Sequence, residues 1–387
     1  MNIVLDIRYF LKMRIAAGDW IIEEGYGGMI GFRVDANEKI ATGHLMRCIA
    51  IATECRKRGE QCLFLLAEDK ETSRLMDRNF PFQVLHSDWQ NMESELDSLG
   101  EIICRKKLDW LVVDSYQATA RYLAKLNQIV PVLYVDDMAR EKYEVSALLH
   151  YGLCGDLEMY LETYRGEPVH IMAGTEYIPL REEFTSPHQM LEDECKVPSS
   201  ETVEKERREK GILITTGGTD PYNITGQLLR SCLEQDVFVG YQYHVIVGSM
   251  NAYEAELRVI ADQHPEVRLH KNVTNISDYM RGCEVAVSAG GTTLFELCAC
   301  GTPTVCFSFA ENQKGGTVDM GRRGIMLYAG DAREGDIVPC ILEHLGDFAE
   351  SESLRSEYTT RMKKLVDGRG VRRIVDYLTS GVELSGC

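Results

Sequence analysis

A histidine and an arginine stand three residues apart at the start of a predicted helix. Residues 40–47 read Ile-Ala-Thr-Gly-His-Leu-Met-Arg and lie between a predicted strand at 30–34 and an amphipathic helix that begins near Gly43. The spacing places His44 and Arg47 on one face of that helix. Because a neutral imidazole can take a proton from water near neutral pH, His44 is a candidate general base. The alternative is a structural histidine that bonds a neighbouring carboxylate.

Polar side chains also follow two apolar strands of the first half. They are Asp114 and Tyr116 after strand 110–113, and Asp136 and Asp137 after strand 132–135. Since parallel strands end at the same edge of a sheet, these groups are expected near His44, where an open α/β sheet binds its ligand. Each aspartate is equally well explained as the N-cap of the helix that follows.

Two glycine pairs occupy strand-to-helix turns in the second half, Gly217-Gly218 and Gly290-Gly291. Glycine lets backbone N–H groups approach a diphosphate closely, and a helix start favours negative charge. Neither turn is a Walker A loop or a GxGxxG dinucleotide fingerprint. One such turn is common in α/β proteins, but two in one domain favour a nucleotide site.

Three side chains near these turns are candidates for the sugar part of a nucleotide. Residues 293–296 read Thr-Leu-Phe-Glu, so Glu296 could bind a ribose diol or simply close a capping box. The spacing alone favours the cap. Asn312 and Gln313 follow the apolar strand 304–307 and carry amides suited to sugar hydroxyls.

Composition excludes several classes of protein. Forty-two basic and sixty acidic residues give a net charge of −18, which disfavours nucleic acid or an anionic membrane as the main partner. No apolar run reaches the roughly 18 residues of a membrane span, and residues 1–28 do not resemble a signal peptide. The thirteen cysteines are scattered, and Cys298 and Cys300 lack a second pair at zinc spacing. We therefore expect a cytoplasmic protein with reduced thiols and no metal.

Strands and helices alternate twice along the 387 residues, on either side of a polar stretch. The pattern predicts an N-terminal extension at 1–28, a Rossmann-like domain at 29–180, a linker at 181–210 and a second Rossmann-like domain at 211–387. The expected fold class is α/β, with two doubly wound domains that face a cleft.

The order of the motifs resembles one family, the UDP-sugar hydrolases of the pseudaminic acid pathway, or PseG family. The resemblance covers about residues 29–345. It rests on the segments 32–35 (FRVD), 42–48 (TGHLMRC), 114–116 (DSY), 136–137 (DD), 179–184 (PLREEF), 216–220 (TGGTD), 288–296 (SAGGTTLFE) and 312–313 (NQ). Two departures stand out. Ala41 replaces the usual glycine, and His150-Tyr151 occupies the place of an asparagine-bearing sugar segment.

The resemblance implies a GT-B fold, like that of MurG-type glycosyltransferases, with UDP in the C-terminal domain. It implies that His44 activates water to attack the anomeric carbon of UDP-2,4-diacetamido-2,4,6-trideoxy-β-L-altropyranose. UDP would leave with inversion, and no cofactor would be needed. The substrate contacts predicted on this basis are Arg33, Asp35, Gly43, Arg47, Asp114, Tyr116, Gly217, Gly218, Ser288, Gly290, Gly291, Thr292, Thr293, Glu296, Asn312 and Gln313.

Two other functions remain open at this point. A GT-B glycosyltransferase with a UDP-sugar donor, acting in surface or spore-coat polysaccharide synthesis, would carry a similar glycine-histidine turn. A lipid-linked acceptor would call for an apolar and basic patch, but the one basic run, residues 105–107, is better explained as a solvated helix end. A non-catalytic nucleotide-sugar-binding protein is the third option, and the intact His44 argues against it.

Overall fold

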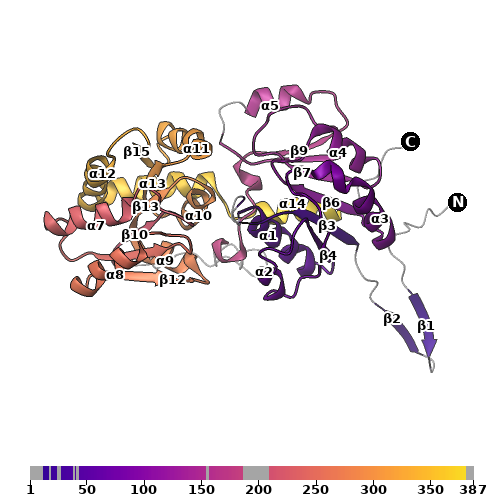
Figure 1. Ribbon diagram of the computed structural model, residues 1–387, viewed down its shortest axis with the longest axis horizontal. Helices are drawn as coiled ribbons and strands as arrows, with labels where there is room; N and C mark the ends of the chain where they lie inside the picture. The colour runs from indigo at the N-terminus through magenta and orange to yellow at the C-terminus, as the bar shows by residue number, and fades with distance from the viewer. Residues whose placement is uncertain are drawn as a thin grey trace. The chain divides into compact units, whose positions relative to one another are not determined.

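The computed structural model describes residues 12–16, 19–23, 28–37, 40, 43–153, 157–185 and 209–380 (Figure 1). The chain divides into two compact units. Unit 1 comprises Met1–His150, Met159–Ala173 and Val371–Cys387, and unit 2 comprises Tyr151–Glu158 and Gly174–Gly370. Ala41, Thr42 and most of the predicted linker, from 186 to 208, lie outside the described residues.

Unit 1 is built on a seven-stranded parallel sheet with the strand order β5-β4-β3-β6-β7-β8-β9. The strands are β3 (Met29–Val34), β4 (Gln61–Leu66), β5 (Phe82–Val84), β6 (Trp110–Asp114), β7 (Val132–Val135), β8 (Ala147–His150) and β9 (His170–Ala173). The β6 strand is buried throughout, as expected for an apolar strand covered on both faces. The order reverses between β3 and β6, so their carboxyl ends form the switch point where such sheets bind ligands.

The helices of unit 1 connect these strands. They are α1 (Gly43–Lys57), α2 (Ser73–Met76), α3 (Leu96–Lys106), α4 (Ala120–Asn127) and α5 (Leu157–Thr163), with a short 3₁₀ turn, η1 (Met92–Glu95), before α3. The α5 helix joins unit 1 from Met159 onward. The α4 helix starts after Thr119, whose side chain accepts a hydrogen bond from the Tyr122 N–H. The helical segment before β6 has two parts, because the 3₁₀ turn η1 leads directly into α3.

Unit 2 repeats the plan with a six-stranded parallel sheet of order β12-β11-β10-β13-β14-β15. Its strands are β10 (Glu209–Thr215), β11 (Gln242–Val247), β12 (Val267–Lys271), β13 (Cys283–Ala289), β14 (Thr304–Ser308) and β15 (Leu327–Asp331). Its helices are α7 (Ile224–Glu234), α8 (Glu254–Gln263), α9 (Ile276–Gly282), α10 (Thr292–Cys300), α11 (Glu311–Arg322), α12 (Val338–Glu350) and α13 (Glu352–Leu365). Here the order reverses between β10 and β13, the two strands that precede the glycine pairs.

The compact units differ from the predicted domains in three segments, the first of which is Tyr151–Glu158 in unit 2. The last helix, α14 (Gly370–Thr379), follows unit 2 in sequence but clusters with unit 1 from Val371 onward. The reason is aromatic packing, because the Tyr377 ring stacks on His170 at 3.9 Å and meets Trp110 edge-on at 5.6 Å. Conversely, Gly174–Leu180 was assigned to the first domain but belongs to unit 2, where Thr175 donates a hydrogen bond to the Leu365 carbonyl.

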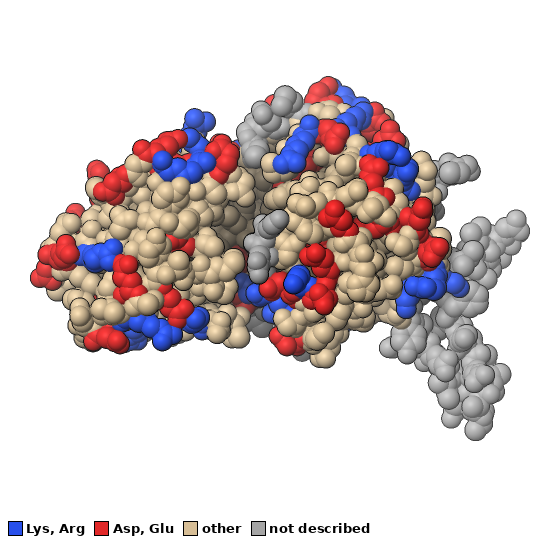
Figure 2. Space-filling view, viewed as in Figure 1, with Lys and Arg blue, Asp and Glu red and all other residues tan. Residues whose placement is uncertain are grey.

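The N-terminal extension contains an antiparallel pair of strands, β1 (Lys12–Ala16) and β2 (Asp19–Glu23), which the sequence reading did not anticipate. Within the described part of the chain, no helix has the length and apolar character needed to cross a membrane. On the face shown in Figure 2, Lys and Arg lie among Asp and Glu on both units. The described part of this face therefore has no large patch of a single charge.

Candidate functional site

The switch point of unit 1 brings together the predicted histidine and the carboxylate at the end of β6. His44 lies in the first turn of α1, and its Nδ1 is 2.5 Å from Oδ1 of Asp114. Both side chains are buried, with exposures of 8% for His44 and 0% for Asp114. The two residues are 70 positions apart in sequence, and the pairing of β3 with β6 joins them.

The pairing determines which nitrogen of His44 carries its proton. Burial would raise the pKa of Asp114, but the guanidinium of Arg47 and the imidazole of His44 outweigh it and hold that pKa well below its usual value. An ionised carboxylate can only accept a hydrogen bond, so we assign the proton to Nδ1 of His44. Among the described residues, Nε2 has no hydrogen-bond partner, and it is therefore free to accept a proton.

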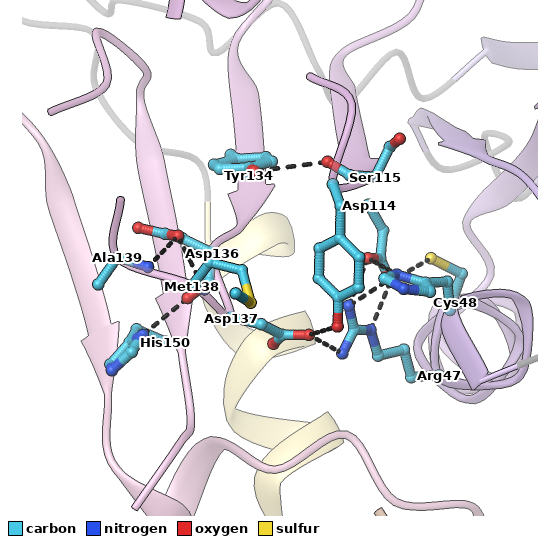
Figure 3. Close-up of polar contacts among 12 residues, drawn as sticks. Arg47, Cys48, Asp114, Ser115, Tyr134, Asp136, Asp137, Met138, Ala139 and His150 are labelled. Carbon is cyan, nitrogen blue, oxygen red and sulfur yellow. Dashed lines mark hydrogen bonds and ion pairs between the residues drawn. The ribbon is translucent and has the colours of Figure 1, made fainter. Parts of the chain in front are cut away.

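Arg47 lies one turn further along α1 and joins two strand ends. Its Nε and Nη2 atoms donate to the two oxygens of Asp114, each at 2.5 Å, and its Nη1 donates to Oδ2 of Asp137 at 2.6 Å. Nη2 also lies 2.9 Å from Nδ1 of His44. Figure 3 shows the guanidinium between the two carboxylates. Arg47 was predicted to contact substrate, but this structure directs it to acidic side chains.

Tyr116 completes the group. Its ring meets the His44 ring edge-on, with 4.5 Å between centroids, and its hydroxyl donates to Oδ2 of Asp137 at 3.2 Å. Burial of the hydroxyl and the nearby charge of Asp137 raise the pKa of Tyr116 above its usual value. Tyr116 as a residue is 38% exposed, so part of it can meet a ligand. We refer to His44, Arg47, Asp114, Tyr116 and Asp137 as the histidine cluster.

The predicted contacts Arg33 and Asp35 form a separate network. Arg33 is completely buried, and its guanidinium donates to Glu95 at 2.6 and 3.0 Å and to Asp35 at 2.6 Å. These carboxylates offset the effect of burial and raise the pKa of Arg33. Asp35 in turn accepts the Ala67 N–H at the end of β4. Arg33 therefore braces the strand ends and does not face solvent, contrary to its predicted contact with substrate. Sequence reasoning missed Glu95, which gave no local signal.

The first glycine turn of unit 2 follows β10. Gly217 has a positive φ of 77°, and both Gly217 and Gly218 are exposed. A Cβ on Gly248 would lie 2.3 Å from the Gly217 carbonyl oxygen, so the two backbones approach as closely as glycine allows. Asp220 closes the turn by accepting the N–H groups of Ile224 and Thr225, each at 2.9 Å.

The second glycine turn connects β13 to α10. Gly291 precedes the first helical residue, Thr292, with a φ of 134° that a side chain would strain. Gly290 packs against α11, where an added Cβ would meet Thr317 and Gln313 at 2.7 and 2.8 Å. Gly291 and Thr292 are exposed and Thr293 is partly exposed. A helix start with open backbone N–H groups is suited to an anion.

Glu296 lies one turn into α10 and does not form the predicted capping box, because no side chain caps this helix start. Its Oε1 accepts a hydrogen bond from Arg181 at 3.3 Å, and 15% of its side chain is exposed. Burial raises the pKa of Glu296, although Arg181 opposes the shift. Ser288 is also buried and donates to the Ala289 carbonyl, so its hydroxyl is directed inward.

The two predicted amides divide in their roles. Oε1 of Gln313 accepts the Phe309 N–H at 3.0 Å and so holds the loop after β14, whereas Asn312 is exposed. Sequence reasoning missed a cavity of about 460 Å³ at the carboxyl end of β12, lined in part by His270, Asn275 and Tyr279. Among the described residues, no group of three or more His, Cys, Asp or Glu side chains could hold a metal ion.

Comparison with known proteins identifies the fold. No family model matches the chain. The chain is similar to the spore coat polysaccharide biosynthesis protein SpsG of Bacillus subtilis, with 21% identity over 353 residues, which cover 90% of this chain and 97% of SpsG. Among solved structures, MurG of Acinetobacter baumannii superimposes with a TM-score of 0.62 at 12% identity, covering 91% of this chain and 99% of MurG.

A second solved structure is HepE (Alr3699) of Anabaena in complex with UDP-glucose. It superimposes with a TM-score of 0.55 at 12% identity, covering 91% of this chain and 99% of HepE. Identities this low show the fold alone. The two parallel-sheet α/β units have the GT-B glycosyltransferase fold, as predicted from the sequence.

Proposed function

We propose that the protein is a UDP-sugar enzyme of polysaccharide biosynthesis, and that it transfers the sugar to a hydroxyl group with His44 as general base. The observation that carries the proposal is the His44–Asp114 pair at the switch point of unit 1, which leaves Nε2 free. Its support from relatives is the similarity to SpsG, a polysaccharide biosynthesis protein, and the fold shared with glycosyltransferases.

The chemistry follows from the assigned proton positions. Nε2 of His44 removes the proton from the attacking hydroxyl as its oxygen bonds to the anomeric carbon. The bond between that carbon and the diphosphate breaks, and its electron pair leaves on the β-phosphate of UDP. Asp114 remains ionised and stabilises the imidazolium that forms, in the way a buried aspartate supports histidine in serine proteases. Attack opposite to the leaving group inverts the anomeric carbon.

Unit 2 supplies the nucleotide site of the proposal. The proposed contacts there are the backbone N–H groups of the turns at Gly217-Gly218 and Gly291 to Thr293, which are suited to a diphosphate. The N–H of Gly290, although predicted as a contact, donates to the Phe307 carbonyl at 2.8 Å. Glu296 is proposed to accept hydrogen bonds from the ribose through the oxygen that Arg181 does not occupy. The cavity at the end of β12 carries Tyr279 and the Asn275 amide, a composition suited to the base of the nucleotide.

Hydrolysis is the second candidate, with water in place of the acceptor hydroxyl. The observation in its favour is the set of segments that resembles the PseG family, above all residues 42–48 and 179–184. In that case the substrate would be UDP-2,4-diacetamido-2,4,6-trideoxy-β-L-altropyranose or a close relative. The same base and the same nucleotide site would serve both reactions.

One assay separates the two. The protein is incubated with UDP-N-acetylglucosamine and with the UDP-diacetamido sugar, each with and without a panel of mono- and disaccharide acceptors, and UDP release is followed. Transfer predicts release that depends on an acceptor, whereas acceptor-independent release identifies a hydrolase. Calorimetric titration with UDP alone is the second measurement. Absence of binding there would refute both readings.

A further inference from the structure

The side chains of the histidine cluster form a closed ring of contacts. Nδ1 of His44 donates to Asp114, whose two oxygens also accept from Nε and Nη2 of Arg47. The Nη1 atom of Arg47 then donates to Asp137. Asp137 accepts a hydrogen bond from the Tyr116 hydroxyl, and the Tyr116 ring contacts the His44 ring edge-on, which closes the ring of contacts. Three segments contribute to the ring, namely α1, the end of β6 and the end of β7. Each side chain in it is therefore held from two sides.

The charges in this ring argue against a role for Arg47 in binding a phosphate. Its guanidinium has a side-chain exposure of 7% and faces two carboxylates, so one positive charge is set against two negative charges. A phosphate brought to this place would meet net negative charge. Bidentate pairing also holds the carboxylate of Asp114 in one orientation, which a single hydrogen bond would not do.

The loop that carries Asp137 is itself anchored from the other side of β7. The Asp136 carboxylate accepts N–H groups from Met138 and Ala139 and the hydroxyl of Tyr160, at 3.3, 2.8 and 3.1 Å. The Nδ1 of His150 lies 2.7 Å from the Asp136 carbonyl oxygen, to which it donates (Figure 3). Asp137 is therefore presented to Arg47 by a fixed turn, and the contact is not a chance meeting of surface side chains.

We propose that Arg47 and Asp137 are positioning residues for the base. Arg47 fixes Asp114 so that His44 keeps its proton on Nδ1 and its free lone pair on Nε2, and Asp137 fixes Arg47 and the Tyr116 ring. This inference rests on the proposed function, because it assigns a task to residues that touch His44 without touching the reacting atoms. It also accounts for a buried arginine at the start of a helix, where a positive side chain is otherwise unfavourable.

The proposal predicts opposite effects of two substitutions on the pH profile of kcat/KM. Arg47→Met removes a positive charge beside His44, which makes protonation of the base easier, so the acid limb moves up by about one pH unit. Asp137→Asn removes a negative charge and moves the acid limb down, by less. The charged and titratable groups that face His44 among the described residues are Asp114, Arg47, Tyr116 and, through them, Asp137.

Loss of position also lowers the rate. Misplacement of a catalytic group by about 1 Å costs about 100-fold, which we take as the expected fall in kcat for Arg47→Met. Arg47→Lys keeps the charge without the bidentate geometry, and we expect a fall of about 10-fold with little movement of the acid limb. The matched control is Arg56→Lys. Arg56 lies on the same helix, and its contacts are the Arg78 carbonyl and the Phe80 ring.

The experiment measures kcat, KM and the pH profile for these variants, with the melting temperature of each. Acid limbs that shift in opposite directions, while the Arg56→Lys profile matches the parent, support the proposal. Shifts in the same direction, or profiles that coincide with the control, overturn it. If Arg47→Met unfolds, the other two variants decide the question. A lower kcat for Arg47→Lys with an unmoved acid limb, together with a lowered acid limb for Asp137→Asn, supports the proposal, and profiles and rates that match the Arg56→Lys control overturn it. A fully active His44→Ala variant would instead refute the proposed function, so the two failures are distinguishable.

Discussion

The two switch points of this protein present different kinds of polar group, charged side chains in unit 1 and backbone groups in unit 2. In unit 1 the strand ends carry charged side chains, and the residues that surround His44 are held by hydrogen bonds at 2.5 to 3.2 Å. In unit 2 the corresponding strand ends lead into glycine turns, Gly217-Gly218 and Gly290-Gly291, whose polar groups belong to the backbone, and all of these glycines except the half-buried Gly290 are exposed. The same strand order therefore supports two chemically distinct edges.

The difference follows from what each edge has to do in the proposed reaction. Proton transfer depends on one lone pair in one direction, so His44 needs partners that fix its tautomer and its ring. A diphosphate spreads its charge over many oxygens, so it is bound well by several N–H groups that need only to be uncovered. Substitutions at the first edge should therefore affect kcat, and substitutions at the second should affect affinity for the nucleotide.

The largest expected effect is that of His44→Ala, which removes the base and leaves the nucleotide site intact. We expect kcat to fall by about 10²- to 10⁴-fold, the range typical of general-base catalysis, while the Kd for UDP stays within about twofold. Single-turnover UDP release and calorimetry measure the two quantities. Equal losses in rate and in UDP affinity would contradict the division of tasks between the two edges.

The next effect is that of Gly291→Ala at the start of α10. A side chain at a φ of 134° introduces local strain of about 1–3 kcal/mol, so the turn must change shape. We expect UDP to bind about 10-fold more weakly, with kcat at saturating substrate changed by less. The control is Gly282→Ala at the end of α9, because Gly282 has open space where a Cβ would lie and no positive φ. Similar UDP affinities for both variants would show that the turn is not the anion site.

Much of this architecture could be predicted from the sequence, because the signals for it are local. The apolar run that ends in Asp114 indicates a buried parallel strand, and the structure contains it as β6. The helix start at Gly43 and the two glycine pairs likewise follow from a few consecutive residues. Local periodicity and turn chemistry determine these features, so distance along the chain does not obscure them.

The partners of the site residues could not be predicted, because each pairing joins distant parts of the chain. Arg47 and Asp137 are 90 residues apart, and Arg181 and Glu296 are 115 apart. Arg33 was predicted to contact substrate, since no local pattern indicates that Glu95, 62 residues away, bonds it inside the fold. The return of α14 to unit 1 depends on Tyr377 meeting His170, a contact that neither segment indicates alone.

The smallest effect tests Glu296, the acidic side chain one turn into α10. The Glu296→Gln substitution keeps a hydrogen-bond acceptor but removes the charge, so we expect UDP to bind about 5-fold more weakly near neutral pH, equivalent to about 1 kcal/mol. Calorimetric titration of UDP against each protein measures this loss. Unchanged affinity would mean that Glu296 does not meet the ribose.

The unfolding temperature of the same variant at pH 7 supplies an independent check, because the ionisation of Glu296 affects the stability of the fold. Because burial raises the folded-state pKa of Glu296, its protonated form favours folding. That contribution is present below the ordinary glutamate pKa and is lost as the pH rises through the folded-state value. The charged carboxylate therefore destabilises the fold at neutral pH.

The Glu296→Gln variant tests this cost directly. In the variant, Arg181 keeps Glu183 as an ion partner at 3.0 Å. We accordingly expect Glu296→Gln to unfold at the same or a slightly higher temperature at pH 7, while it binds UDP less tightly. A variant that loses both stability and affinity would show that Glu296 serves the fold, and the charged edge of unit 1 would then have no counterpart in the nucleotide site.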